Sequence, residues 1–129
     1  MSRAGTSRTV VLPAKRECLH EIRTTRWPET VRCPNCNGVD LIKKGRSRKG
    51  AQRYQCQDCE RVFTDITGTF FAGRQLSIAE LCYIVDRVGT ATTTEIARPL
   101  DRTYKTVLNV VHDVQNRTEG ERPDVSDLL

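Results

Sequence analysis

The chain has 129 residues, enough for one ordinary domain or two small modules. Aromatic residues make up only 5% of it, so a large aromatic core is not expected, and its apolar runs are too short for a transmembrane helix. The N-terminus lacks the apolar stretch of a signal peptide, so we expect a cytoplasmic protein, associated with the nucleoid if it binds DNA.

Charge is distributed unevenly along the chain. The formal net charge is +5, but residues 1–75 carry fifteen Lys and Arg against seven Asp and Glu, whereas residues 76–129 carry six against nine. Four thiolates on one zinc ion would contribute roughly −2 and lower the total to about +3. A basic first half predicts a polyanionic partner, most often nucleic acid, bound through a local patch.

The first predicted element is a short helix over residues 14–26. Its apolar side would be formed by Cys18, Leu19, Ile22 and Trp27. Trp27-Pro28 ends the helix, because the residue before a proline is pushed out of the α region. With a flexible arm over residues 1–13, this helix makes up an N-terminal region of residues 1–30.

Two Cys-x-x-Cys pairs follow, Cys33 with Cys36 and Cys56 with Cys59, and nineteen residues separate them. This is the spacing of a four-cysteine zinc site. Two tight turns would place four thiolates around one ion with no open position, so the predicted cofactor is a single structural zinc. Two disulfides or a thioredoxin-like redox motif are the alternatives, disfavoured by the intracellular setting and by the presence of two pairs.

The remaining cysteines and the first histidine are predicted to lie outside the metal site. Cys18 and Cys82 are expected to be small buried residues on helices, and His20 a surface residue, because four cysteines already complete the ligand set.

Residues 31–75 are predicted to form a zinc ribbon. Residues 39–45 and 52–55 form a β-hairpin with its turn at 45–50, and residues 61–64 form a third strand. Six basic side chains of the hairpin are predicted to contact DNA phosphates, a solvated loop being the alternative: Lys43, Lys44, Arg46, Arg48, Lys49 and Arg53. Tyr54 is expected to cover the ribbon core, and residues 67–75 to form a linker or a last strand and turn.

Residues 76–117 change to helical periodicity and predict a helix-turn-helix of three helices. Capping boxes at Ser77 and Thr92 start the first two helices, Pro99 shortens the second, and Thr103 caps the third. The inward face of the third helix is formed by Val107, Val110, Val111 and Val114. Residues 118–129 are expected to form a flexible acidic tail.

The start of the third helix is predicted to enter the major groove of DNA. Arg102 is expected to contact phosphate, and Tyr104 lies beside it. Lys105 would contact a phosphate or guanine, and Asn109 would pair with adenine. The alternative is three-helix packing with no role in DNA binding, which the negative charge of this region favours.

The predicted fold is thus small α+β: a four-cysteine zinc ribbon, preceded by a short helix and followed by a helix-turn-helix. In this order the residues resemble the N-terminal region of zinc-ribbon insertion-sequence transposases, over about residues 15–117. The resemblance is carried by Glu17-Cys18-Leu19, Arg26-Trp27-Pro28, Cys33-Pro34-Asn35-Cys36, Tyr54-Gln55-Cys56-Gln57-Asp58-Cys59, Phe63-Thr64, Thr67-Gly68-Thr69-Phe70-Phe71 and Tyr104-Lys105-Thr106. It implies that these modules recognise the terminal repeats of a mobile element.

The sequence departs from that family in one respect. Such a transposase continues into a catalytic domain with three metal-binding carboxylates, whereas this chain ends at Leu129. Asp113, Asp124 and Asp127 fall on a helix end and a polar tail, without a sheet to position them for two-metal catalysis. We therefore expect a non-enzyme, either a truncated transposase or a stand-alone DNA-binding protein.

Four functions are consistent with these patterns. The first is a protein that binds double-stranded DNA with sequence preference, such as a transcriptional regulator. The second is a zinc-ribbon adaptor that contacts proteins of the transcription machinery. The third is a fragment that acts with a separately encoded catalytic subunit, and the last a redox enzyme. No membrane partner is expected, and the sequence does not define an oligomeric state.

Overall fold

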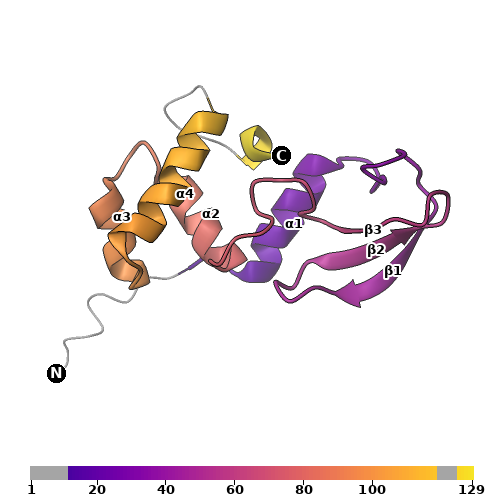
Figure 1. Ribbon diagram of the computed structural model, residues 1–129, viewed down its shortest axis with the longest axis horizontal. Coiled ribbons are helices and arrows are strands. Elements are labelled where there is room, and N and C mark those ends of the chain that lie inside the picture. Colours follow the sequence, from indigo (N-terminus) through magenta and orange to yellow (C-terminus); the bar gives the residue numbers. More distant parts are fainter. Residues whose placement is uncertain (1–11, 119–124) are drawn as a thin grey trace.

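The computed structural model describes residues 12–118 and 125–129. Its elements are α1 (Lys15–Arg26), β1 (Leu41–Arg46), β2 (Gln52–Cys56), β3 (Val62–Thr64), α2 (Ile78–Arg87), α3 (Thr93–Leu100), α4 (Tyr104–Arg117) and the 3₁₀ turn η2 (Val125–Leu128). The sheet lies at one end of the molecule and α2, α3 and α4 at the other, with α1 between them (Figure 1). The predicted small α+β fold is confirmed.

The sheet is antiparallel with the order β1-β2-β3. Lys43 pairs with Tyr54, and Tyr54 pairs with Phe63, whereas a register shift interrupts the pairing between Lys43 and Arg46. The inner face is closed by the stacked rings of Tyr54 and Phe63, whose centroids are 5.2 Å apart. Tyr54 therefore covers the ribbon core, as predicted.

The first helix packs with the helices at the other end of the molecule. Cys18, Leu19 and Ile22 are buried in the same apolar core as residues of α2 and α4. Trp27, directly after α1, packs instead on the ribbon core, with its ring edge-on to Phe63 at 6.1 Å. The helix therefore joins both parts of the molecule, and the boundaries at residues 31, 76 and 118 stay predictions.

The segment between β3 and α2 belongs to the core. Phe70 and Phe71 are fully buried in the helical core, and the Arg74 guanidinium lies 4.3 Å from the centre of the Phe70 ring. The prediction of a linker or a last strand and turn for residues 67–75 is correct only for the turns: the segment has no strand, and its two apolar rings bury more surface than a solvated connection would. The few aromatic residues of the chain are concentrated here and in the ribbon.

The helix starts follow their predicted caps. Ser77 and Thr92 each accept a hydrogen bond from the backbone of the Glu three residues later, and each Glu bonds back to the cap. Pro99 does not shorten α3, which extends to Leu100 and closes through the left-handed residue Asp101. A proline so near the end removes only one N–H donor, and the Asp101 N–H bonds the last carbonyls.

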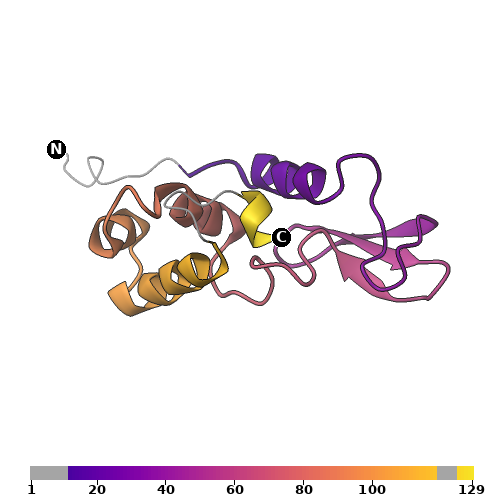
Figure 2. The ribbon, with the colours of Figure 1, turned by 90° about the horizontal axis from the view of Figure 1, so that it is seen from above.

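The C-terminal residues are folded onto the helices. Val125 and Leu128 of η2 are buried, and the Leu128 carbonyl accepts a hydrogen bond from the Phe70 N–H. In Figure 2, η2 lies next to α1, and it also contacts α4. The predicted flexible tail is thus wrong for residues 125–129, since apolar side chains anchor them. The arm over residues 1–11 and the rest of the tail, 119–124, fall outside the described residues.

Candidate metal centre and nucleic-acid interface

The four cysteines of the two pairs meet at one point. The sulfurs of Cys33, Cys36, Cys56 and Cys59 all lie within 4.8 Å of one another. Two sulfur pairs, Cys33 with Cys59 and Cys36 with Cys56, are 3.6 Å and 3.5 Å apart. Four sulfurs held ~2.3 Å from a central ion at tetrahedral angles lie roughly 3.8 Å apart, so the cluster fits zinc.

The two cysteine turns are built alike. In the first, the Asn37 N–H bonds the Cys33 carbonyl, and in the second the Glu60 N–H bonds the Cys56 carbonyl. Asn37 and Glu60 each follow the second cysteine of their pair, and both have positive φ angles, 65° and 67°. This left-handed residue turns the chain so that two sulfurs point to the same centre.

Electrostatics at the cluster favour a bound cation. A backbone hydrogen bond from Arg61 lowers the pKa of Cys59 to about 6, which favours its thiolate. The Gly38 backbone also favours the thiolate of Cys36, but the neighbouring sulfurs raise the pKa of Cys36 to about 12. Thiols this close together do not all lose their protons when no ion is bound, because the thiolates would repel one another. A divalent ion removes this repulsion. The cluster therefore fits the single structural zinc that the sequence predicts.

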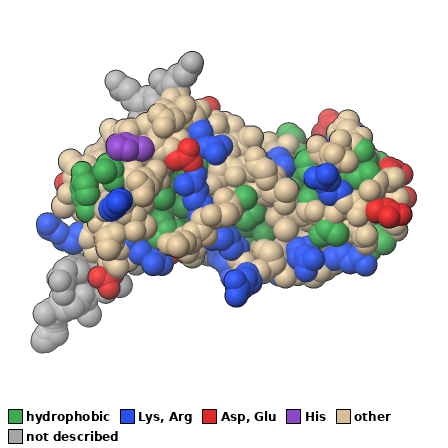
Figure 3. All heavy atoms as spheres, viewed as in Figure 1, with side chains coloured by type: hydrophobic (Ala, Val, Ile, Leu, Met, Phe, Trp, Pro, Cys, Tyr) green, Lys and Arg blue, Asp and Glu red, His purple; other side chains and the backbone are tan. Residues whose placement is uncertain are grey.

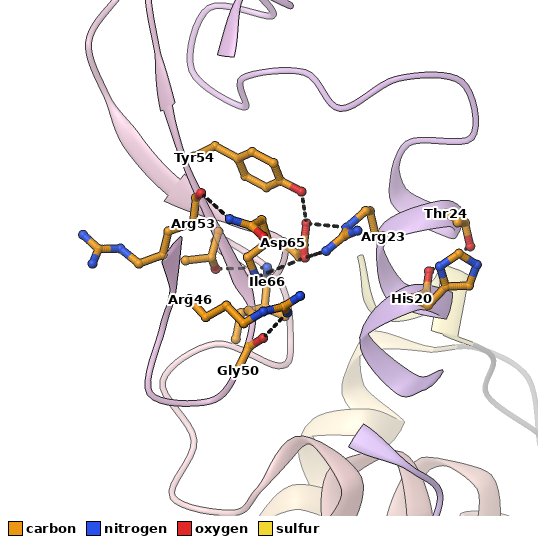
Figure 4. Close-up of polar contacts among 12 residues, drawn as sticks. His20, Arg23, Thr24, Arg46, Gly50, Arg53, Tyr54, Asp65 and Ile66 are labelled. Carbon is orange, nitrogen blue, oxygen red and sulfur yellow. Dashed lines mark hydrogen bonds and ion pairs between the residues drawn. The ribbon is translucent and has the colours of Figure 1, made fainter. Parts of the chain in front are cut away.

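A buried aspartate connects the ribbon to α1. The fully buried carboxylate of Asp65 accepts two hydrogen bonds from the Arg23 guanidinium, at 2.8 and 3.1 Å, and one from the Tyr54 hydroxyl at 2.8 Å. The Arg26 guanidinium bonds the Asp65 carbonyl at 2.9 Å. Figure 4 shows Arg23 from α1 and Tyr54 from β2 converging on Asp65. Burial, with Asp65, raises the pKa of Tyr54, so its phenol stays protonated and donates.

Sequence reasoning missed this network. Its signal was an acidic residue between the apolar Phe63 and Ile66. A carboxylate in such a place needs a buried partner, but the partner Arg23 lies 42 residues earlier, and nothing local identifies it.

The six basic residues of the hairpin divide into two groups. Arg46 and Lys49 support the hairpin, because Arg46 donates to the Gly50 carbonyl at 2.9 Å and Lys49 to the Leu76 carbonyl at 2.6 Å. The side chains of the other four are exposed and have no polar partner among the described residues: Lys43, Lys44, Arg48 and Arg53. Figure 3 shows Lys and Arg side chains gathered along the edge of the ribbon near β1.

On the helical part, all four predicted DNA contacts are exposed, but one of them, Arg102, is bound to a carboxylate. Tyr104, Lys105 and Asn109 lie on the solvent face of α4, and 53% of Tyr104 is exposed. Arg102 instead forms two hydrogen bonds with the Glu80 carboxylate, at 2.8 and 2.9 Å. Its guanidinium thereby links the start of α4 to the start of α2.

Two acidic residues near this face are paired with cations, whereas Asp101, directly before Arg102, is exposed and forms no ion pair among the described residues. Asp113 of α4 forms ion pairs with Arg74 and Arg117, and Glu80 is paired with Arg102. Cys82 is half-buried and Cys18 buried, and burial raises the pKa of each thiol, as expected of cysteines outside a metal site. His20 is exposed, as predicted.

Comparisons with known proteins agree with the ribbon. The zinc-ribbon family described as the InsA N-terminal domain matches residues 29–60. The insertion element iso-IS1N protein InsA of Shigella dysenteriae is 32% identical over 92 residues, which cover 70% of this chain and 94% of that protein. An uncharacterized protein in transposable element ISH50 of Halobacterium salinarum is 33% identical over 115 residues, 85% of this chain. The chain spans only 38% of the length of that relative, and no solved structure matches.

Proposed function

The chain belongs to the InsA family of insertion-element proteins, and we propose from this premise that it binds double-stranded DNA through two surfaces at once. The exposed cations of the hairpin contact the phosphate backbone, and the start of α4 enters the major groove. The DNA would be an end of the mobile element, and the chain would act there as a regulator or as the recognition part of a transposition complex. No catalytic residue is assigned to it.

The observation that carries the proposal is the fixed connection between the two surfaces. Lys49 at the hairpin turn bonds the Leu76 carbonyl, one residue before the cap of α2. In the first turn of α2, Glu80 binds Arg102, which lies next to the cap of α4. The hairpin and the reading helix are thus tied to the same end of α2, which presents them to one ligand in a set geometry.

The charge of α4 also supports a role on DNA. The helical region is net negative in sequence, but Asp113 is paired with Arg74 and Arg117, and Glu80 with Arg102. The solvent face of α4 presents Lys105 and Asn109, and the exposed Asp101 carboxylate lies two residues before the Thr103 cap of this helix. The negative charge of the region therefore weighs less against a DNA contact than the formal sum does.

Arg102 has a different place in this proposal from the one predicted. Because the Nε–Nη2 edge of its guanidinium is bound to Glu80, we propose that it positions α4 rather than contacting phosphate. Arg46 and Lys49 likewise shape the hairpin, and the four exposed cations make the backbone contacts.

A second candidate function is supported by the outer face of the ribbon. Ile42 pairs with Gln55, which pairs with Val62, so Ile42 and Val62 lie on the same face. They are 39% and 46% exposed. An adaptor that docks this face on a protein of the transcription machinery would bury them.

Duplex binding tests the first function. Lys44→Glu should weaken binding several-fold and lower the salt slope of log affinity by about one, and Lys43→Glu with Lys44→Glu should lower it by about two. Arg16→Glu is the matched control, because it changes the charge equally on an exposed residue of α1. Asn109→Ala should cost about 1–3 kcal/mol of preference at one base pair.

The readout is fluorescence anisotropy with duplexes first selected from a random pool. Each variant is compared at equal zinc content, so that a folding defect is separated from a lost contact. If the hairpin reversals bind like Arg16→Glu and Asn109→Ala keeps the preference of the parent, the proposed DNA binding is wrong.

A further inference from the structure

A hollow of about 420 Å³ lies where the hairpin meets the loop between β3 and α2. Arg48, Lys49 and Arg53 line it from the hairpin, and Ile66, Thr67 and Ala72 line it from the loop. Ile66 is buried and Ala72 half-buried, whereas Arg48 and Arg53 are exposed. The hollow therefore has an apolar floor and a cationic rim.

The rim carries cations that the fold itself leaves available. Arg48 and Arg53 have no ion-pair partner among the described residues, and Figure 4 shows Arg53 projecting away from the Asp65 network. The Lys49 ammonium has three N–H donors, and its bond to the Leu76 carbonyl uses one. No carboxylate is among the described residues that line the hollow.

We infer that this hollow binds one sugar–phosphate unit of a DNA strand, with the deoxyribose against Ile66 and Ala72 and its flanking phosphates on the cations of the rim. The inference rests on the proposed DNA binding and names where the backbone is held. A deoxyribose is an apolar ring between two anions, which matches an apolar floor between cations. Guanidinium groups suit phosphate oxygens because they donate in a planar, two-pronged geometry.

Other ligands match the hollow less well. A nucleobase flipped out of the DNA duplex would need an aromatic side chain to stack on, and none of the described residues that line the hollow is aromatic. A free anion would need buried donors, whereas Arg48 and Arg53 stand at the exposed rim and Lys49 is only half-buried.

The location of the hollow adds a geometric consequence. It lies beside Lys49, the residue that ties the hairpin to the start of α2. A strand held there would be fixed in register relative to α4, because both surfaces are anchored to the same end of α2. Phosphate contacts of this kind position a protein on the duplex while base contacts specify the sequence.

Filling the hollow tests the inference. Ala72→Leu adds three carbons to its floor, and Ala14→Leu adds the same three on an exposed residue before α1. At fixed salt, Ala72→Leu should weaken duplex binding about tenfold or more, while Arg53→Gln should lower the salt slope by about one. In the double variant the two fold-losses should be less than multiplicative, because both act on the same contact.

A second measurement keeps the test valid if Ala72→Leu loses its zinc. Single neutral methylphosphonate linkages are placed along each strand, and binding is measured with the parent chain and with Arg53→Gln. The expected result is one strand position where the neutral linkage weakens the parent several-fold but leaves Arg53→Gln unaffected. Inorganic phosphate at ionic strength matched with chloride should not compete.

Several results would overturn the inference: a folded Ala72→Leu that binds like Ala14→Leu, fully multiplicative losses, no linkage that depends on Arg53, or competition by inorganic phosphate beyond its ionic strength. Lys44→Glu separates this failure from a failure of the proposed function, because it lies outside the hollow. If Lys44→Glu still weakens binding, the chain binds DNA without using the hollow; if it does not, DNA binding by the hairpin is itself wrong.

Discussion

Asp65 shows how a single buried charge organises this small protein. Its carboxylate is fully buried, and three hydrogen bonds from Arg23 and Tyr54 compensate the loss of water around it. Arg23 belongs to α1 and Tyr54 to the ribbon, so the same group connects the two parts of the chain. If Asp65 stabilised only the ribbon, it would not need Arg23, which lies 42 residues earlier in the chain, as a partner.

Replacing this carboxylate should be costly. Asp65→Asn removes the charge that pairs with Arg23, and we expect a loss of about 2–4 kcal/mol in the free energy of unfolding. Urea denaturation of the zinc-loaded chain measures it. Asp40→Asn is the control, because Asp40 is exposed and its substitution should change stability by less than about 0.5 kcal/mol. Equal stabilities of the two variants would mean that Asp65 does not hold the ribbon to α1.

Glu80 allows a second prediction about a single residue, which concerns how stability depends on pH. The Arg102 guanidinium holds the pKa of Glu80 below its ordinary value of 4.5, so the ionised form stabilises the folded chain. This contribution is complete above about pH 4.5 and is lost as the pH falls through the lowered folded-state pKa. Because Arg102 is partly exposed, we expect about 1 kcal/mol.

The substitution that isolates this charge is Glu80→Gln, since glutamine also suits the third position of a capping box. The variant should be less stable than the parent at pH 7, and the gap should narrow below pH 4.5. Asp86→Asn serves as the comparison, because the Asp86–Arg87 pair is exposed. A gap that stays constant with pH would show that the charge of Glu80 contributes nothing.

Among the helices and strands, the features that could be predicted from the sequence are those that a short segment determines by itself. The caps at Ser77, Thr92 and Thr103 and the spacing of the cysteine pairs each depend on residues within one turn or one motif. The strands of the hairpin follow from their alternation and from the turn between them. These features can be predicted because the contacts that stabilise them lie between residues close together in the sequence.

Other features depend on partners far along the chain and were not predicted. The burial of Phe70 and Phe71 requires a core that α1, α2 and α4 build together, so their segment resembled a linker. The anchoring of Leu128 depends on the Phe70 N–H, 58 residues before it. The division of the hairpin cations into supporting and exposed groups depends on where Leu76 and Gly50 lie, which residue spacing does not give.

For the whole molecule, the arrangement is a metal-stiffened ribbon coupled to a helical unit. The ribbon core contains few apolar residues, mainly Tyr54 and Phe63 beside the cysteines. So small a core does not stay folded without further support, and here the metal supplies it. Among the described residues, no helix is both long and apolar enough to cross a bilayer.

The single tryptophan makes the ribbon observable in the intact chain. Trp27 contacts Phe63 edge-on, and the Arg26 guanidinium lies 4.4 Å from the centre of its ring. Its emission therefore reports on the ribbon core and on the end of α1 together. Because the chain has no other tryptophan, the helical unit adds no tryptophan emission to the signal.

The most direct measurement removes the metal and follows three signals in the same sample: zinc content, Trp27 emission and duplex affinity. We predict one zinc per chain, and we predict that a chelator shifts the emission of Trp27 to the red and lowers affinity at least about tenfold, both recovering when zinc is restored. A natively purified chain without metal, or a stripped chain that keeps its emission and its affinity, would contradict the role of the four cysteines in DNA binding.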